Sequence, residues 1–398
     1  MSGIPPTVPS YPPLPAGSAA WYRQFSGSFV ALVLLVAIVV GTPVVIAVHQ
    51  AGNYFLFSPG TAPVITTSSQ CRPAGGELAL PDGSPCVHLV VPAGKARSVT
   101  GELLMVDVEV SQAGALDWAE WELGLLGKDH EMIPSSEYAG TTPTSELGCQ
   151  DTQEMLSANQ DAALAALSRL GYRVAEIPDG AQLNTVFASS PAWLAGLQCG
   201  DTITALNGKP VVSAEALAAT LSPDPPGTTV VLTDDPASGG APKKVKVSLV
   251  APPASALAQG FQGRAYLGVE TQDRVKLRLP FSVSVDAGDI GGPSAGLAFT
   301  LAILDALSNG RLTGGHKVAA TGTMGPTGAV GDVGGVREKT AAVQRAGAQV
   351  FFVPEVEYQT AESVADGRLT VVPVTTLSQV LQILHQRYGG DLAGLSRT

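Results

Sequence analysis

The sequence predicts an α+β protein of more than one domain, with a single transmembrane helix near its N-terminus. Three features predict this class: a long uncharged apolar run, segments of alternating apolar and polar residues between turn residues, and apolar residues at helical spacing. The 398 residues exceed one ordinary domain and suffice for two or three. A net charge of −11 leaves no basic stripe for phosphates, so we expect no nucleic-acid partner.

The apolar run from Phe29 to Val48 has twenty residues without a charge, which as a helix rise about 30 Å, enough to span a bilayer core. The alternative is a cleaved signal peptide, but its apolar region would be shorter and a small-residue cleavage site would follow. Arg23 lies just before the run, and no Lys or Arg follows it until Arg72. This asymmetry predicts a Pro-rich cytoplasmic tail over residues 1–28, a single-pass span in the cell membrane, and an extracytoplasmic remainder.

Residues 49–170 are expected to form an extracytoplasmic segment that serves as scaffold for the protein's last domain. Leu103–Val110 alternates like a half-buried strand, and Thr152–Leu170 has apolar residues at helical spacing. We identify no catalytic chemistry in residues 51–170.

Four cysteines lie on the expected outer side, where disulfides persist: Cys71, Cys86, Cys149 and Cys199. Cys71 and Cys86 flank a loop rich in Gly and Pro and are the favoured pair; their spacing fits no zinc signature, so no metal is predicted. The alternative is four unpaired thiols.

The segment from Ser190 to Val211, SPAWLAGLQCGDTITALNGKPV, resembles the bacterial PDZ domain. In that pattern a short helix lies against a strand, and Asn207-Gly208 suits a type I′ hairpin turn. The resemblance implies a domain over residues 171–252, with a helix at Ala214–Leu221 beside a groove that binds an extended peptide as an added strand. We expect the loop that binds the peptide carboxylate just before the strand 183–188, at Gly180, Ala181 and Gln182. The alternative is a compact spacer without a ligand.

The segment around Ser294 reads GGPSAG and precedes a nearly all-apolar run to Leu307, which predicts a buried helix. The first turn of such a helix offers unpaired N–H groups and partial positive charge, so a serine there can serve as nucleophile beside its own oxyanion hole. The expected oxyanion residues are Gly292, Pro293 and Ala295. The alternative is that Ser294 caps the helix.

Lys339 lies on the apolar side of a second predicted helix. At 100° per residue from Val336, its polar residues form one arc and its apolar residues another, with Lys339 in the apolar arc. The polar arc consists of Arg337, Glu338, Gln344 and Arg345. Desolvation lowers the pKa of a lysine that faces a core, so that its amine can be neutral near pH 7 and accept the proton of a serine hydroxyl. The alternative is a lysine whose stem packs and whose amine reaches water.

The Gly-x-Ser-x-Gly pattern also occurs in α/β-hydrolases, which need a later Asp and His. His385 has the right order, but it falls on the polar arc of its predicted helix, and His316 has no acid close in sequence. We therefore rank a Ser/Lys pair above a Ser/His pair.

Residues 263 to about 388 resemble the proteolytic domain of Lon-family serine peptidases. Four pieces carry the resemblance: Gly292-Pro293-Ser294-Ala295-Gly296, Val318-Ala319-Ala320-Thr321-Gly322, Gly334-Gly335-Val336-Arg337-Glu338-Lys339, and Ala346-Gly347-Ala348. The resemblance implies that Ser294 is the nucleophile, Lys339 the general base, and Thr321 the residue that orients the lysine amine. It places this domain at residues 260–398.

Two departures separate this chain from the ATP-driven Lon enzymes. It has no Gly-x-x-x-x-Gly-Lys-Ser/Thr loop, so no ATP or other cofactor is expected, and Thr323 stands where those enzymes usually have an acidic residue. The order of segments resembles the membrane-anchored PDZ-containing Lon-like proteases of Gram-positive bacteria. We therefore expect an ATP-independent serine endopeptidase that cleaves unfolded or flexible polypeptides, and the resemblance also implies assembly of several copies. The alternative is a non-catalytic PDZ adaptor on a degenerate Lon fold.

Overall fold

The computed structural model describes residues 45–74, 77–140, 144–258, 260–261 and 265–395. The predicted tail, residues 1–28, and most of the predicted span, residues 29–44, lie outside this described part. The last residues of the span belong to a short helix over residues 45–51. Within the described part of the chain, no helix combines the length and apolar character that crossing a bilayer requires.

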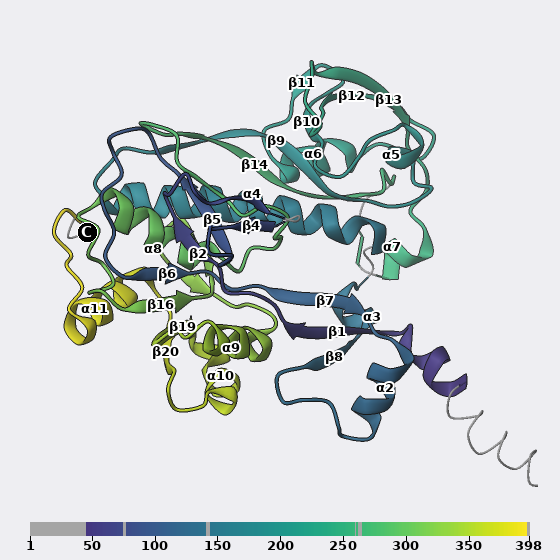
Figure 1. Ribbon diagram of the computed structural model, residues 1–398. Coiled ribbons are helices and arrows are strands. Elements are labelled where there is room, and N and C mark those ends of the chain that lie inside the picture. Colours follow the sequence, from purple (N-terminus) through teal and green to yellow (C-terminus); the bar gives the residue numbers. More distant parts are fainter. Residues whose placement is uncertain (1–44, 75–76, 141–143, 259, 262–264, 396–398) are drawn as a thin grey trace, which may run out of the picture.

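The central element is a seven-stranded mixed sheet in the order β15-β5-β2-β6-β16-β19-β20 (Figure 1). The strands β6, β16, β19 and β20 run parallel, whereas β2 pairs antiparallel with β6. The bounds are β2 (Val64–Thr66), β5 (Cys86–Val90), β6 (Glu102–Leu104), β15 (Ser284–Asp286), β16 (Lys317–Ala320), β19 (Val350–Pro354) and β20 (Thr370–Val374). Three of the seven strands therefore come from residues before 105, far from the other four in sequence.

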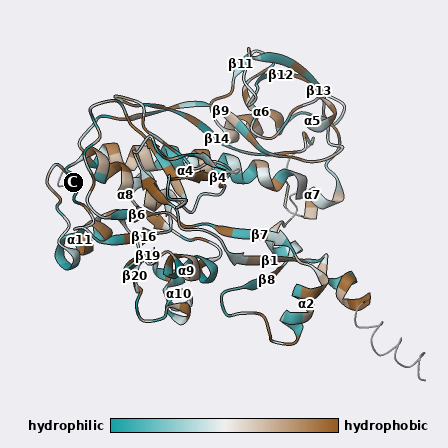
Figure 2. Ribbon diagram, in the orientation of Figure 1, coloured by the Kyte–Doolittle hydropathy of each residue, from teal (hydrophilic) through white to brown (hydrophobic). Residues whose placement is uncertain are grey.

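Helices cover both faces of this sheet. Successive strand residues point to opposite faces, and because both sets are apolar and buried, each face packs against helices. Val318 and Ala320 pack into one core with the first helix group, whereas Ala319 packs into another core with the second group. The first group is α4 (Thr144–Arg169), α8 (Gly296–Leu307) and α11 (Leu377–Tyr388); the second is α9 (Val336–Arg345) and α10 (Tyr358–Val364), which the 3₁₀ turn η2 (Glu355–Glu357) precedes. Every residue of α8 except Leu307 is buried, in keeping with its mainly hydrophobic colouring in Figure 2.

The middle domain has its own sheet, in the order β13-β12-β10-β9-β14, with β11 paired to β10. Its core is separate from the two cores of the central sheet. The strands are β9 (Ala175–Val186), β10 (Thr202–Leu206), β11 (Lys209–Pro210), β12 (Thr229–Asp235), β13 (Lys243–Ser248) and β14 (Val269–Arg278); the helices are α5 (Pro191–Leu194), α6 (Ala214–Leu221) and α7 (Ala254–Ala258).

The structure moves the predicted boundaries of the middle domain. The sequence predicts that this domain ends at residue 252 and that the next begins at residue 260. In the structure, however, β14 pairs with β9 from Val269↔Val186 to Arg278↔Ala175. Residues up to Arg278 therefore belong to the middle sheet. Local pattern could not show this, because the two strands that pair are more than eighty residues apart.

A smaller three-stranded sheet, β7-β1-β8, packs beside α9. Its bounds are β1 (Tyr54–Pro59), β7 (Val108–Gln112) and β8 (Glu131–Pro134), with α2 (Ala115–Glu122) and α3 (Ser135–Tyr138) next to them. Two hairpins complete the fold, β3 (Arg72–Ala74) with β4 (Glu77–Ala79) and β17 (Thr323–Met324) with β18 (Val330–Gly331). The class is mixed α/β.

Both pairs of cysteines form disulfides. Cys71 is bonded to Cys86, the pair that their flanking loop favoured. Cys149 is bonded to Cys199, a bridge that joins the first turns of α4 to the middle domain and that sequence spacing did not reveal.

We predict that a fragment of residues 260–398 does not fold, whereas residues 49–398 do. The short fragment lacks β2, β5 and β6, so β16 loses one of its two parallel partners, β6, and the buried residues of α8 lose the α4 surface on which they pack. Thermal unfolding followed by circular dichroism checks this. A cooperative transition in the short fragment would contradict it.

Candidate active site

Ser294 and Lys339 meet at the edge of the central sheet where the parallel strands β6 and β16 end. In open α/β sheets this carboxyl edge is where ligands usually bind. The residues that follow β16 hold the serine: the Gly322 N–H donates to the Ser294 carbonyl at 2.9 Å and the Thr321 hydroxyl donates to the same oxygen at 3.2 Å. The serine and the lysine thus reach one point from opposite faces of the sheet, the serine in the turn before α8 and the lysine on α9.

The turn that carries Ser294 precedes α8, which begins at Gly296 rather than at Pro293 as the sequence indicated. Gly292 has φ +86°, a conformation that glycine adopts without strain. Gly291 lies against α4: a Cβ on it would come within 2.6 Å of the Asp151 Cβ. The Gly292 N–H donates to the Asp151 carbonyl at 2.8 Å, so α4 holds the part of the turn that precedes Ser294.

These bonds correct the predicted oxyanion hole. The Gly292 N–H is already bonded to Asp151, and Pro293 has no N–H to donate. The amides of Ser294 and Ala295 make no hydrogen bond to another described residue. They lie at the mouth of α8, where the helix dipole favours negative charge, and they are the donors that an oxyanion at Ser294 could use.

Lys339 is buried and in contact with the serine. Its side chain is only 4% exposed, and Nζ lies 2.9 Å from the Ser294 Oγ. Burial lowers the pKa of Lys339 to about 8, while the carboxylates of Asp107, Glu357 and Glu338 act in the opposite direction. The sequence placed Lys339 on the buried side of its helix, and the structure places it there.

Thr321 makes no hydrogen bond to the Lys339 amine, the contact that the resemblance implied. Its hydroxyl donates to the Ser294 carbonyl, and its N–H donates to Phe352 in β19. Thr321 therefore positions the serine backbone rather than the lysine amine.

Asp107 lies in the cleft that contains the pair, and sequence reasoning missed it. The cleft has a volume of about 560 Å³ and is lined by apolar side chains, such as Phe57 and Met155, and by the carboxylates of Asp107, Asp151 and Asp289. The Asp107 carboxylate accepts hydrogen bonds from the Thr61 hydroxyl, at 2.9 Å, and from the Thr61 N–H. The available sequence signal was that Asp107 is an acidic residue in the alternating segment Leu103–Val110. Because Asp107 lines the cleft, residues 51–170 do contribute to the site.

Glu338 is fully buried, although the sequence placed it on the polar arc of its helix. The reason is that α9 packs against β1 of the small sheet as well as against the central sheet. Its carboxylate makes no hydrogen bond to another described residue. Burial raises its pKa to about 7, and the nearby Glu131 adds to the effect.

The two histidines of the alternative triad lie outside the cleft. His385 is exposed near the end of α11, where its Nδ1 lies 2.7 Å from the Gly390 carbonyl. His316 Nδ1 lies 3.1 Å from the Gln349 side chain, and its ring packs edge-on against Tyr388. Neither lines the cleft around Ser294. Among the described residues, no group of His, Cys, Asp and Glu could hold a metal ion.

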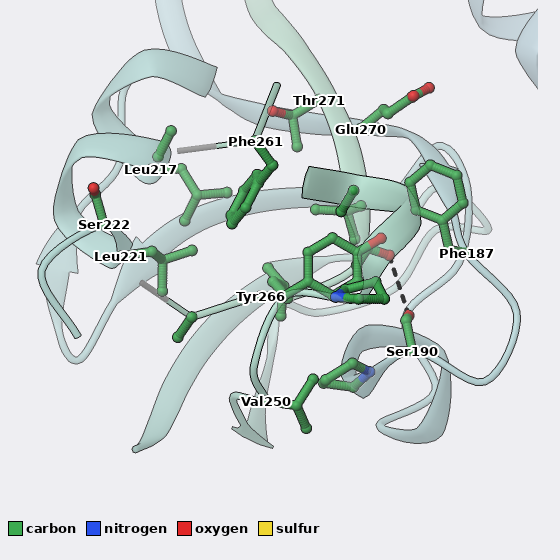
Figure 3. Close-up of a pocket in the computed structure, with 18 of the residues that line it drawn as sticks. Phe187, Ser190, Leu217, Leu221, Ser222, Val250, Phe261, Tyr266, Glu270 and Thr271 are labelled. Carbon is green, nitrogen blue, oxygen red and sulfur yellow. Dashed lines mark hydrogen bonds between the residues drawn. The ribbon is translucent and has the colours of Figure 1, made fainter. Parts of the chain in front are cut away.

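A second and larger hollow lies in the middle domain, away from the Ser–Lys pair. It has a volume of about 1060 Å³ and runs between α6 and the start of β14 (Figure 3). β14 is the last strand of its sheet, and within the described chain its outer edge pairs with no strand. An extended peptide could therefore add to this edge, with its side chains toward Ala218, Leu221 and Ser222 of α6.

The groove lies elsewhere than the sequence placed it. Gly180, Ala181 and Gln182 are inside β9, where Gln182 pairs with Thr202 on one side and Gln272 on the other. They are enclosed between two strands and cannot contact a peptide at the edge. The prediction was wrong because the groove strand is the last of this domain in sequence.

The turn at the end of the groove is Tyr266-Leu267-Gly268. Gly268 has φ +84°, and a Cβ there would come within 2.1 Å of the Ser190 side chain, whose hydroxyl donates to the Gly268 carbonyl at 3.1 Å. Tyr266 stacks edge-on against Phe261. A glycine just before an alternating strand was the sequence signal for this turn.

Comparison with known families identifies both domains. Residues 271–387 match the Lon protease (S16) C-terminal proteolytic domain, and residues 184–233 match the PDZ domain. The chain thus carries the proteolytic domain of a serine peptidase family together with a PDZ domain.

Similar proteins include a mitochondrial Lon protease homolog of Candida albicans, 39% identical over 99 residues, which are 24% of this chain and 9% of the relative. A Lon protease of Malacoplasma penetrans is 38% identical over 95 residues, 23% of this chain and 12% of the relative. The chain thus spans about a tenth of the length of these relatives. The crystal structure of the PDZ domain of an SdrC-like protein from Listeria monocytogenes aligns with 23% of this chain and 87% of its own, at 22% identity and a TM-score of 0.20.

We predict that Glu338→Gln stabilises the protein more at pH 8 than at pH 5. The carboxyl has an ordinary pKa of 4.5 and a folded pKa of about 7, so its favourable contribution is present at low pH and is lost as the pH rises through about 7. Glutamine does not ionise, so the variant avoids this loss of stability at high pH. Urea unfolding at both pH values measures the difference, with Glu362→Gln, an exposed position on α10, as the control. The same gain at both pH values would contradict the prediction.

Proposed function

We propose that this protein is a membrane-anchored, ATP-independent serine endopeptidase in which Ser294 is the nucleophile and Lys339 the general base. The observation that carries the proposal is the 2.9 Å contact between a serine hydroxyl at the mouth of α8 and the amine of a lysine that is only 4% exposed. A hydroxyl needs an adjacent base to become a nucleophile, and a desolvated lysine amine is such a base.

The reaction begins when neutral Lys339 accepts the proton of the Ser294 hydroxyl as Oγ attacks the carbonyl carbon of the scissile bond. The oxyanion accepts hydrogen bonds from the amides of Ser294 and Ala295, next to the positive end of the α8 dipole. Protonated Lys339 then gives its proton to the leaving amine, and an acyl-enzyme remains on Ser294. Lys339 next accepts a proton from a water whose oxygen attacks the ester carbonyl. As the bond to Oγ breaks, Lys339 returns that proton to Oγ, which releases the acid and restores the serine hydroxyl.

The substrates we propose are unfolded or flexible extracytoplasmic polypeptides. The chain has no phosphate-binding loop to drive unfolding, so a segment must enter the cleft already extended. The uncharged run 29–48 supports a membrane anchor with the catalytic domain outside. The open edge of β14 supports recruitment of substrates through the PDZ groove.

We predict that Ser294→Ala and Lys339→Met each lower the labelling rate of the full-length protein by a fluorescent fluorophosphonate by about a thousandfold or more. Labelling of the unaltered protein should increase with pH through about 8, since Lys339 must lose its proton to act as the base. The measurement is the labelling rate constant between pH 6 and 9.5.

His385→Ala, which changes an exposed residue outside the cleft, is the control and should label normally. Labelling that survives Lys339→Met but is lost in His385→Ala would replace the Ser–Lys pair with a Ser–His pair. If the unaltered protein labels no faster than Ser294→Ala, the chain is a non-catalytic PDZ adaptor.

We predict that Ala218→Arg lowers kcat/KM for fluorescein-labelled casein, an unfolded protein, by several-fold and leaves the fluorophosphonate labelling rate unchanged. The arginine would occupy the groove beside β14, far from the reacting atoms. Thr220→Arg is the matched control, since Thr220 is exposed on the same helix but does not line the groove. Equal kcat/KM values for the two variants would exclude recruitment through the groove.

A further inference from the structure

The first turns of α4 contact both the catalytic turn and the PDZ domain. On one side, the Asp151 carbonyl accepts the Gly292 N–H at 2.8 Å, and Gly291 packs so closely on Asp151 that no Cβ would fit. Two residues earlier, Cys149 is bonded to Cys199, in the turn before β10 of the PDZ domain. A covalent link to the PDZ domain and the support of the catalytic turn are thus less than one helical turn apart.

Polar contacts reinforce the bridge. Gln153 is 7% exposed and accepts a hydrogen bond from the Gln182 Nε2 at 2.8 Å, and the Gln272 Nε2 donates to the Gln182 Oε1 at 2.9 Å. Gln272 lies on β14, the strand that borders the groove, and Gln182 lies on β9 beside it. A continuous chain of bonds therefore runs from the groove strand through β9 to α4.

The paired strands β9 and β14 also connect the PDZ domain to the rest of the chain. Figure 1 shows α4 extending past α8 to lie beneath the PDZ domain, so the bridge closes a second connection at the far end of the helix. Helix ends fray more readily than helix centres, and the turn at residues 149–153 is near the N-terminal end of α4. Without the bridge, this turn would be free to shift and to carry the Asp151 carbonyl with it.

We propose that the Cys149–Cys199 disulfide is a positioning element for catalysis: it clamps the PDZ domain to α4 so that the Asp151 carbonyl holds the Gly292 turn in the reactive position. The PDZ domain is then part of the framework of the active site as well as a recruitment module. This inference rests on the proposed Ser294 and Lys339 mechanism. A displacement of about 1 Å in a reacting group can lower a rate by about a hundredfold, so a modest shift of the turn is sufficient.

The chain offers a matched control, because its second bridge joins Cys71, just before β3, to Cys86 at the start of β5, and neither cysteine lines the cleft. In full-length Cys71→Ser/Cys86→Ser protein, only the Cys149–Cys199 bridge can be reduced. In full-length Cys149→Ser/Cys199→Ser protein, only the other bridge can. Each of these two proteins is measured in three states: oxidised, reduced by a phosphine, and reoxidised.

Two readouts separate positioning from general stabilisation. The first is the rate constant for labelling of Ser294 by a fluorescent fluorophosphonate, a reagent too small to need the groove. The second is hydrogen exchange in the peptide that contains Gly292, which reports the bond to Asp151 whether or not the enzyme is active. Circular dichroism establishes that the reduced proteins stay folded at the assay temperature.

We expect reduction of Cys149–Cys199 to lower the labelling rate by about tenfold to a hundredfold and to speed exchange at Gly292, and reoxidation to reverse both. Reduction of Cys71–Cys86 should change neither. Gln153→Met, with both bridges intact, should shift both readouts in the same direction by a smaller factor.

Unchanged labelling and unchanged exchange after reduction of Cys149–Cys199 would overturn the inference, as would equal effects from the two bridges. Faster exchange at Gly292 in a protein that labels no faster than Ser294→Ala would instead show that the turn is clamped but that the proposed catalytic function is wrong.

Discussion

The site depends on one contact, between an amine that is almost completely removed from water and a hydroxyl at the start of a buried helix. A lysine in solution is protonated at neutral pH and cannot act as a base. The fold solves this with two helices that cover opposite faces of one sheet: the lysine lies on α9, the serine lies in the turn before α8, and the two meet at the end of β16. The burial of α8 and α9 is therefore a condition of the proposed chemistry as well as of stability.

The pKa of Lys339 reflects two opposed effects. Desolvation lowers it, whereas the carboxylates of Asp107, Glu357 and Glu338 raise it, and burial is the larger effect. With a pKa of about 8, roughly a tenth of the amine is neutral at pH 7. A substrate that fills the cleft removes more water from the amine and shifts this balance further toward the neutral form. While the buried Glu338 retains its proton, it is uncharged and does little to raise the pKa of Lys339.

Local sequence pattern predicted the parts of the site that depend on helical phase and on glycine-rich turns. The position of Lys339 follows from its place on a helix with one apolar side, and that of Ser294 from the turn before an apolar run. Glu338 was misplaced because α9 is covered by a second sheet, which the helix's own sequence does not show. The same limit explains Asp107, because the pairing of β6 with β16 joins residues more than two hundred positions apart. The groove and the Cys149–Cys199 bridge likewise depend on strand order and on how α4 meets the PDZ domain.

The most direct test of the account is the pKa of Lys339 itself. The chain has nine lysines, so the protein with ¹³C-labelled lysine Cε gives a small set of signals that can be titrated by NMR, with Lys339→Met identifying the signal of interest. This one signal should titrate near pH 8, well below the ordinary lysine pKa of about 10.4. A Lys339 signal that titrates above pH 10 would mean that the amine is hydrated and charged, and the account of Lys339 as the base would be wrong.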